Sequence, residues 1–211
     1  FEVDNGLEDL NKANLALLLV VALYTIYGLV DDLVDLSRIM KLFLPIMFSF
    51  PLIQILYPEN IWLPFLGIID LETIFYSHFT FTDLFRALII PVYVMVVVNL
   101  VNMHSGYNGQ QTGLSVLVII TILLKTFEDG NYKQILPGAA ILGAMCAFWI
   151  YNRYPSRVFE GNIGSMLFGS TIGVALVIQE YWWFGFFIMI PHTFNFLLWI
   201  IWLILMKKKI T

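Results

Sequence analysis

Charged side chains are scarce in this sequence. Only 12% of its 211 residues are charged, whereas 60% are hydrophobic and the mean hydropathy is +0.84. A soluble globular domain has about 25% charged and about 45–50% apolar residues, so this composition excludes a soluble protein. The apolar runs are continuous, as in NLALLLVVALYTIYGLV, and lack the alternation of membrane β-strands. The chain is therefore predicted to be an integral membrane protein built from helices.

Cysteine is rarer still, since Cys146 is the single one and no internal disulfide can form. Its place within an apolar stretch favours a packing role. The sequence begins with Phe1 rather than methionine, so we expect the natural N-terminus to lie upstream. Neither a signal peptide nor a long linker or repeat is visible, which favours one membrane domain over residues 1–211.

Long apolar runs are what the sequence has most of. A helix needs about 20 residues to cross a hydrocarbon core of about 30 Å, and this criterion predicts an all-α polytopic fold of about seven transmembrane helices. The second is short and holds two prolines, so a kink or tilt is expected there. The expected spans are 13–30, 42–57, 86–102, 113–127, 135–151, 163–180 and 184–206.

Lysine and arginine are divided unevenly between the two sides that seven spans create. The loops of one side carry seven basic and four acidic residues, net +3, and those of the other carry four basic and eleven acidic, net −7. Because basic loops stay on the cytoplasmic side, the first side is predicted to be cytoplasmic. The segment 59–85 is then external and is expected to form a short hairpin or to lie along the interface.

The first polar segment on the predicted cytoplasmic side is GLVDDLVDLSRIMK, residues 28–41. Asp31 and Asp32 are adjacent carboxylates, each of which resists ionising beside the other unless a cation is near. They are either a solvated helix end or a site for a cation or a proton. Arg38 and Lys41 follow at a spacing that can share their face, or they are interfacial anchors.

The second segment is NLVNMHSGYNGQQTG, residues 99–113. Asn99 and Asn102 are three residues apart at a helix end and so share a face. They either cap the helix and bond neighbouring helices, or offer oxygen ligands to Mg²⁺, which prefers such hard donors. The three glycines of SGYNGQQTG would let the backbone approach a ligand closely.

The third segment, NRYPSRVFEGNIGS at 152–165, places charge and amides between two very apolar stretches. Arg153 and Arg157 have the charge to hold carboxylates or phosphates. Structural salt bridges and substrate contacts are both open for these two arginines.

Taken together, the three segments resemble the membrane family that transfers a sugar 1-phosphate from a UDP-sugar to a polyprenyl phosphate. The pattern G-x-x-DD-x-x-x-L-x-R-x-x-K at 28–41 is followed by N-x-x-N-x-x-x-G-x-NG-x-x-x-G at 99–113 and N-x-YPSRVF-x-G at 152–161. In order and spacing these are similar to the eukaryotic and archaeal N-acetylglucosamine-1-phosphate transferases, and more distantly to the bacterial MraY enzymes.

The resemblance implies a catalytic centre with Mg²⁺ as cofactor. Asn102 matches an asparagine that ligates the metal, and Asn162 stands at the position of its second protein ligand. Lys41 matches a lysine near the diphosphate, and Asp31 and Asp32 match an acidic pair at the reaction centre. That pair is either the base for the lipid phosphate or a structural or metal-tuning element.

The resemblance also implies a nucleotide subsite. Asn108 matches a residue that hydrogen-bonds uracil, and Phe159 matches an aromatic that stacks on the base, as suits a planar ring. Asn99, Arg153 and Arg157 are assigned to substrate binding with them.

This sequence departs from the family pattern in three ways. The position of Asn162 usually holds aspartate, so the ligating oxygen is kept and a charge is lost. An early acidic loop would lie upstream of Phe1, and the basic, histidine-containing C-terminal loop is not found before the chain ends in MKKKIT. His78, His104 and His192 do not supply that loop, and a plain polar role is favoured for His104.

The expected function is transfer of N-acetylglucosamine 1-phosphate from UDP-N-acetylglucosamine to a dolichyl or polyprenyl phosphate, with release of UMP. This is the first lipid-linked step of N-glycan or related glycan assembly, in an archaeal cell membrane or the endoplasmic reticulum membrane, with the site facing the cytoplasm. The alternatives are an inactive binding or assembly subunit and a membrane transporter. A homodimer is left open, and no nucleic-acid partner is expected.

Overall fold

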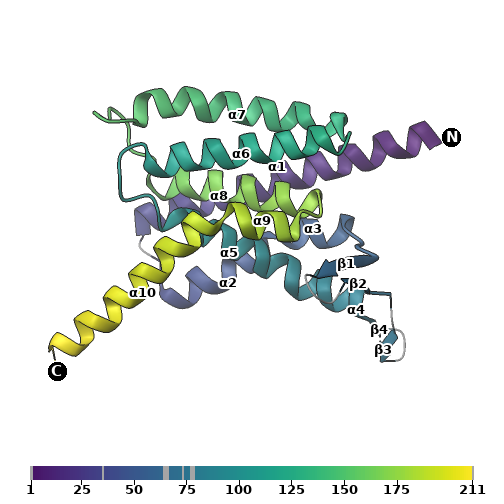
Figure 1. The fold of residues 1–211 in the computed structure, drawn as a ribbon, viewed down its shortest axis with the longest axis horizontal. Helices are drawn as coiled ribbons and strands as arrows, with labels where there is room; N and C mark the ends of the chain where they lie inside the picture. Colours follow the sequence, from purple (N-terminus) through teal and green to yellow (C-terminus); the bar gives the residue numbers. More distant parts are fainter. Residues whose placement is uncertain (1, 35, 64–66, 73, 77–78, 211) are drawn as a thin grey trace.

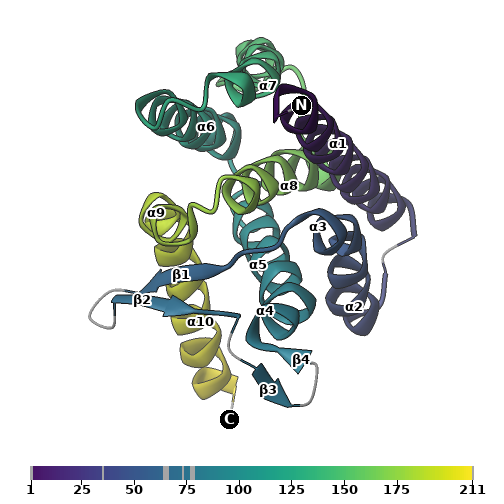
Figure 2. The ribbon, with the colours of Figure 1, turned by 90° about the vertical axis from the view of Figure 1, so that its right-hand side faces the viewer.

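The computed structural model describes residues 2–34, 36–63, 67–72, 74–76 and 79–210. Helix α8 (Gly161–Ile178) lies at the centre and packs against α1 (Glu2–Val34), α5 (Ile90–Asn102) and α6 (Gln110–Glu128). Figure 2 shows α8 between α1 and α5, with α6 and α7 (Tyr132–Asn152) beyond it.

Small side chains let α8 occupy this central position. A Cβ added to Gly169 would lie 2.8 Å from Val98 Cα, so the backbones of α8 and α5 are in direct contact there. At the start of α8, a Cβ on Gly28 would lie 2.6 Å from the carbonyl oxygen of Asn162, so α1 is equally close. Close approach through small residues suits helices in lipid, where packing rather than the hydrophobic effect drives association.

The prediction of seven spans is wrong. Among the described residues, four helices are long and apolar enough to cross a membrane, or five if a bent pair counts as one span. The four are Asn11–Val34, Phe81–Asn102, Gln110–Glu128 and Gly161–Ile178.

The expected span 42–57 is broken into α2 (Arg38–Phe48) and α3 (Phe50–Ile55). Pro51 sits in the first turn of α3, where its missing N–H is tolerated, and it disfavours helical geometry in the residue before it. The N–H of Ser49 bonds back to the carbonyl of Ile46, which closes α2 with a tight turn. The apolar part that remains, Phe43–Ile55, is too short to span.

Helix α7 forms where a span was expected at 135–151 but is not among the four.

A proline also shapes the next span. Helix α4 (Phe81–Leu84) runs through a π-helical turn, η1 (Phe85–Ile89), into α5. Pro91 lacks the N–H that a regular helix would use, and its ring would clash with the carbonyl four residues earlier. The wider π-turn just before it accommodates this defect, so the helix continues as one span, Phe81–Asn102.

Within the segment 59–85, the strands between residues 60 and 80 form two hairpins, which was one of the two expected outcomes, and residues 81–85 are helical. Strand β1 (Asn60–Leu63) pairs antiparallel with β2 (Gly67–Asp70), and β3 (Ile74–Tyr76) pairs with β4 (Phe79–Thr80). The described chain is otherwise helical. In Figure 1 the hairpins lie at the right, opposite the end of the bundle where α1 and α7 finish and α6 and α8 begin.

The last expected span, 184–206, is the bent pair. Helix α9 (Trp182–Ile188) meets α10 (Ile190–Ile210) at 60°. Figure 1 shows α10 running obliquely away from the bundle. Apolar side chains such as Leu198 and Trp202 are exposed along it, which suits contact with lipid.

The close contact between α5 and α8 gives a direct test. Gly169→Ala should push the two backbones apart and destabilise the protein by about 1–3 kcal/mol, seen as a lower melting temperature of the full-length protein in detergent. The matched control is Gly143→Ala on α7, where an added Cβ meets nothing within 4 Å. It should be neutral or stabilising by up to about 1 kcal/mol. Equal melting temperatures for both variants would contradict this account of the contact.

Candidate functional site

The end of α1 and the start of α2 hold an ion pair between a buried carboxylate and a partly exposed lysine. Asp31 is 7% exposed, and its Oδ1 lies 2.8 Å from Lys41 Nζ and accepts a hydrogen bond from the N–H of Leu36 at 3.1 Å. Ser37 caps α2 and helps to turn the chain so that Lys41 comes back over Asp31. A carboxylate can be buried at acceptable cost only when it is paired and hydrogen-bonded in this way. The side chain of Arg38, the other predicted cation, lies outside the described residues.

The start of α8 bonds to both carboxylates of the acidic pair. Asn162 donates from Nδ2 to Asp31 Oδ2 at 3.1 Å, and its backbone N–H lies 3.4 Å from Asp32 Oδ1. Gly161 precedes it with a φ of +56°, a conformation that glycine adopts readily. Asp32 therefore lies at the positive end of the α8 dipole, where a negative charge is stabilised.

The end of α5 joins the same cluster through one serine. Ser165 Oγ lies 2.5 Å from Asn102 Oδ1 and 3.2 Å from the carbonyl oxygen of Asn162. Asn99 behaves differently, because its Nδ2 donates to the carbonyl of Met95 within α5. The structure thus brings Asn102 into the cluster and bonds Asn99 to its own helix.

The donor chemistry of this cluster fits Mg²⁺. Three helix ends supply two carboxylates and two amides, all of them oxygen donors of the kind that Mg²⁺ prefers. In the part of the chain that the structure describes, no group of three or more histidine, cysteine, aspartate or glutamate residues could hold a metal ion, here or at another place, so the amides would have to supply ligands. The four side chains are Asp31, Asp32, Asn102 and Asn162.

A second buried polar cluster lies beside the first. Thr112 at the start of α6, Asn152 at the end of α7 and Glu160 before α8 are each no more than 6% exposed. Thr112 Oγ1 is 3.0 Å from Asn152 Oδ1 and 2.6 Å from Glu160 Oε2. The Thr112 hydroxyl has one proton but faces two acceptor oxygens. Both contacts are satisfied when the hydroxyl donates to Asn152 and a neutral, protonated Glu160 donates to the hydroxyl.

Burial favours the same protonation state. It raises the pKa of Glu160 to about 7, against the smaller opposing effect of the hydrogen bond with Thr112. Thr112 and Asn152 were not among the predicted site residues. Asn152 opens the third motif at a helix end, and a buried amide there was the available signal.

The predicted nucleotide residues lie on the surface next to this second cluster. Asn108 is exposed, and Phe159 is 58% exposed. Arg153 and Arg157 are also exposed and line an open hollow with Tyr151. Neither arginine has an ion pair within the described chain, so the structural salt bridges left open by the sequence are not seen there.

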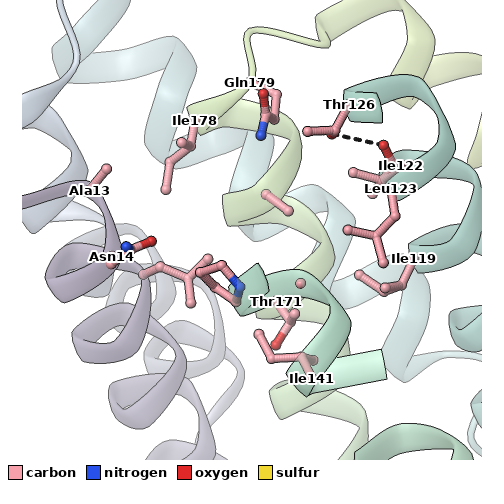
Figure 3. Close-up of a pocket in the computed structure, with 14 residues that line it drawn as sticks. Ala13, Asn14, Ile119, Ile122, Leu123, Thr126, Ile141, Thr171, Ile178 and Gln179 are labelled. Atoms are coloured by element: carbon pink, nitrogen blue, oxygen red, sulfur yellow. Dashed lines mark hydrogen bonds between the residues drawn. The ribbon is translucent and has the colours of Figure 1, made fainter. Parts of the chain in front are cut away.

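Two other features stand apart from these clusters. His104 is buried against His192, with ring centroids 4.6 Å apart, and burial lowers the pKa of His104. A mainly apolar cavity of about 50 Å³ lies between α1, α6, α7 and α8. Figure 3 shows its lining, with Thr126 and Gln179 at the far ends of α6 and α8. It contains none of the predicted site residues. His78 lies outside the described residues.

Comparison with known proteins assigns the chain to a family. Residues 14–180 match glycosyl transferase family 4. The chain belongs to this family. The resemblance drawn from the three motifs is therefore confirmed at the family level, a family of UDP-sugar:polyprenyl-phosphate sugar-1-phosphate transferases whose enzymes generally use Mg²⁺.

Proteins similar to this chain include archaeal and bacterial ones. A protein of Sulfolobus acidocaldarius, provisionally named UDP-N-acetylglucosamine–dolichyl-phosphate N-acetylglucosaminephosphotransferase, is 30% identical over 81% of this chain and 50% of its own length. A provisionally named glycosyltransferase of Methanocaldococcus jannaschii is 30% identical over the same shares. The phospho-N-acetylmuramoyl-pentapeptide-transferase of Lactobacillus johnsonii is 23% identical over 83% of this chain and 56% of its own length. The chain spans about half the length of these curated relatives.

The raised pKa of Glu160 predicts a pH dependence of stability. The folded protein releases this proton near pH 7, whereas the group ordinarily ionises at 4.5. Between these values the folded state holds a proton that the unfolded chain has lost, so stability falls as pH rises, by at most about 1.4 kcal/mol per pH unit. Glu160→Gln cannot ionise, so its melting temperature should fall less than that of the wild type between about pH 5 and about pH 7.

The matched control is Glu128→Gln, which removes an exposed carboxylate at the other end of α6. It should keep the wild-type pH profile. A profile of Glu160→Gln that parallels the wild type would mean that Glu160 ionises as freely in the folded state as in the unfolded chain.

Proposed function

We propose that the full-length protein transfers N-acetylglucosamine 1-phosphate from UDP-N-acetylglucosamine to a dolichyl or other polyprenyl phosphate, and that this chain carries the donor site. The observation that carries the proposal is the joining of Asp31, Lys41, Asn102 and Asn162 from three distant motifs into one hydrogen-bonded cluster. The names of the archaeal relatives support the donor sugar and the lipid. Residues 1–211 would belong to one membrane domain.

In the proposed reaction an oxygen of the lipid phosphate forms a bond to the β-phosphorus of the donor. The bond from that phosphorus to the bridging oxygen breaks, and UMP leaves with that oxygen. Bound Mg²⁺ would supply charge stabilisation for the diphosphate, and Asp31, Asp32, Asn102 and Asn162 would hold it. Lys41, whose charge is anchored by Asp31, would face the negative charge that develops on the leaving nucleotide.

The remaining assignments concern the exposed residues next to the second cluster. Phe159 presents an exposed ring for stacking on uracil, and Asn108 presents an exposed amide for its edge. Arg153 and Arg157 lie on the same loop, and their exposed guanidinium groups, which have no ion pair among the described residues, suit phosphate. We assign this end of the bundle to the cytoplasmic side, as the charge of its loops favours.

A transporter is less well supported. Transporters gather polar groups near the bilayer midplane, often at broken helices. Here both polar clusters lie where α1, α5 and α7 end and where α6 and α8 begin. An inactive binding subunit would keep the nucleotide site and lose turnover, so nucleotide binding and Mg²⁺ dependence are tested separately.

Nucleotide binding is tested by thermal unfolding of the purified full-length protein. UDP should raise the melting temperature, because a ligand that binds only the folded state stabilises it. Phe159→Ala and Asn108→Ala should each reduce the shift at a fixed UDP concentration through lost stacking and lost base hydrogen bonds.

Phe187→Ala is the matched control, since this ring is also 58% exposed but lies on α9. It should leave the shift unchanged. No shift in the wild type, together with no heat of binding in calorimetry, would rule out the donor site.

Asn162 allows the metal assignment to be tested. Asn162→Asp places a carboxylate where an amide N–H₂ now donates to Asp31, so repulsion should lower the melting temperature in the absence of divalent cations. Mg²⁺ should then stabilise the variant more than the wild type and should support UMP release at lower concentration.

Asn131→Asp adds the same charge at the exposed start of α7, at the opposite end of the bundle, and should change neither property. Identical Mg²⁺ titrations for Asn162→Asp and the wild type would place Asn162 away from the metal.

A further inference from the structure

One buried amide connects the two segments of the proposed nucleotide subsite. Asn152 is 1% exposed, and its Oδ1 accepts a hydrogen bond from the N–H of Gly109 at 3.0 Å. Its Nδ2 donates to the carbonyl oxygen of Val158 at 3.0 Å. Gly109 directly follows Asn108 in the chain, and Val158 directly precedes Phe159. The Asn152 side chain is thus hydrogen-bonded to the backbone neighbours of Asn108 and Phe159, the two residues assigned to uracil binding.

The Asn108 side of this bridge has little freedom. Gly109 has a φ of +73°, and a Cβ added there would lie 2.8 Å from Arg153 Cα. Its carbonyl oxygen accepts a hydrogen bond from Trp149 Nε1 at 3.1 Å. Gly109 is therefore held from both its N–H and its carbonyl by α7, which fixes where Asn108 emerges.

The Phe159 side is held on both flanks. Before it, the carbonyl of Val158 accepts from Asn152 and also from Ser156 Oγ at 2.8 Å. After it, Glu160 is bonded to Thr112 at 2.6 Å. The ring of Phe159 is exposed, but the backbone on either side is hydrogen-bonded to the buried cluster. The position of the ring is therefore fixed by its backbone.

We propose that Asn152 is a positioning residue that sets the separation of Asn108 and Phe159 and thereby the preference of the subsite for uracil. The proposal rests on the proposed function, because it takes these two residues as the base contacts. Asn152 does not touch the nucleotide. It holds the Asn108 amide and the Phe159 ring at a fixed separation before the ligand binds, so that less conformational entropy is lost on binding.

The informative variant is Asn152→Asp. It keeps an oxygen that can accept from Gly109 and Thr112, but it replaces the donor to Val158 with a second oxygen that faces a carbonyl. The Phe159 side should be released while the Asn108 side is retained. The affinity of the full-length protein for UDP, measured by calorimetry, should fall about tenfold, and the ratio of UDP to CDP affinity should fall with it.

The kinetic readout separates positioning from general damage. In Asn152→Asp the KM for UDP-N-acetylglucosamine should rise, while kcat and the Mg²⁺ titration should change little. Ser156→Ala removes the second bond to Val158 from an exposed loop and should shift UDP affinity in the same direction by a smaller factor. It serves as the test if Asn152→Asp does not fold.

Ser170→Ala is the control for loss of one buried hydrogen bond, because Ser170 is fully buried on α8 and, among the described residues, its hydroxyl bonds to its own helix at Leu167. It should keep wild-type UDP affinity and base preference. If the wild type binds UDP and the Asn152 and Ser156 variants bind UDP and CDP as the wild type does, the positioning role is wrong and the donor site stands. If the wild type binds no UDP, the proposed function fails, and the positioning role fails with it.

Discussion

The buried carboxylate of Asp31 is the constraint on which this end of the protein depends. A carboxylate at 7% exposure must be matched by donors, and here they come from Lys41 on α2, from Asn162 on α8 and from the backbone of Leu36. The contact with Asn162 joins segments that are 131 residues apart in sequence. It also explains why α1 and α8 must touch closely at Gly28, since any larger residue there would separate Asp31 from Asn162.

Among the described residues, no side-chain hydrogen bond joins the two polar clusters, but one short stretch of chain carries members of both. Glu160 belongs to the cluster of Thr112 and Asn152, and Asn162 belongs to the cluster of Asp31, with Gly161 alone between them. A shift of the loop that moves Glu160 would therefore be passed to the start of α8 and to Asp31. In the proposed enzyme, this short link would couple the binding of uracil to the arrangement of the groups around the diphosphate.

Sequence alone was sufficient for the parts that depend on local pattern. Continuous apolar runs predicted helices. The resemblance to the family, rather than any local pattern, implied that Asp31, Lys41, Asn102 and Asn162 share one site, and the structure brings them into one hydrogen-bonded cluster. The number of spans was overestimated because hydropathy does not show that Pro51 divides 42–57 into two short helices. Asn99 was grouped with Asn102 by spacing, yet its amide bonds to Met95 in its own helix. The role of Asn152 depends on two backbone partners far apart in sequence, which no local pattern contains.

Asn162 can now be understood from its contacts. An aspartate at this position would face the carboxylate of Asp31, and such a pair is stable only with a cation or a proton between its members. The amide instead donates to Asp31 and leaves its own oxygen as a neutral donor. The carboxylate of Asp31 is therefore matched by the charge of Lys41 and the amide of Asn162 without a metal ion. In the proposed site, asparagine in place of aspartate would lower the affinity for Mg²⁺, make metal binding depend more on the charge of the incoming diphosphate, and keep the cluster stable before either arrives.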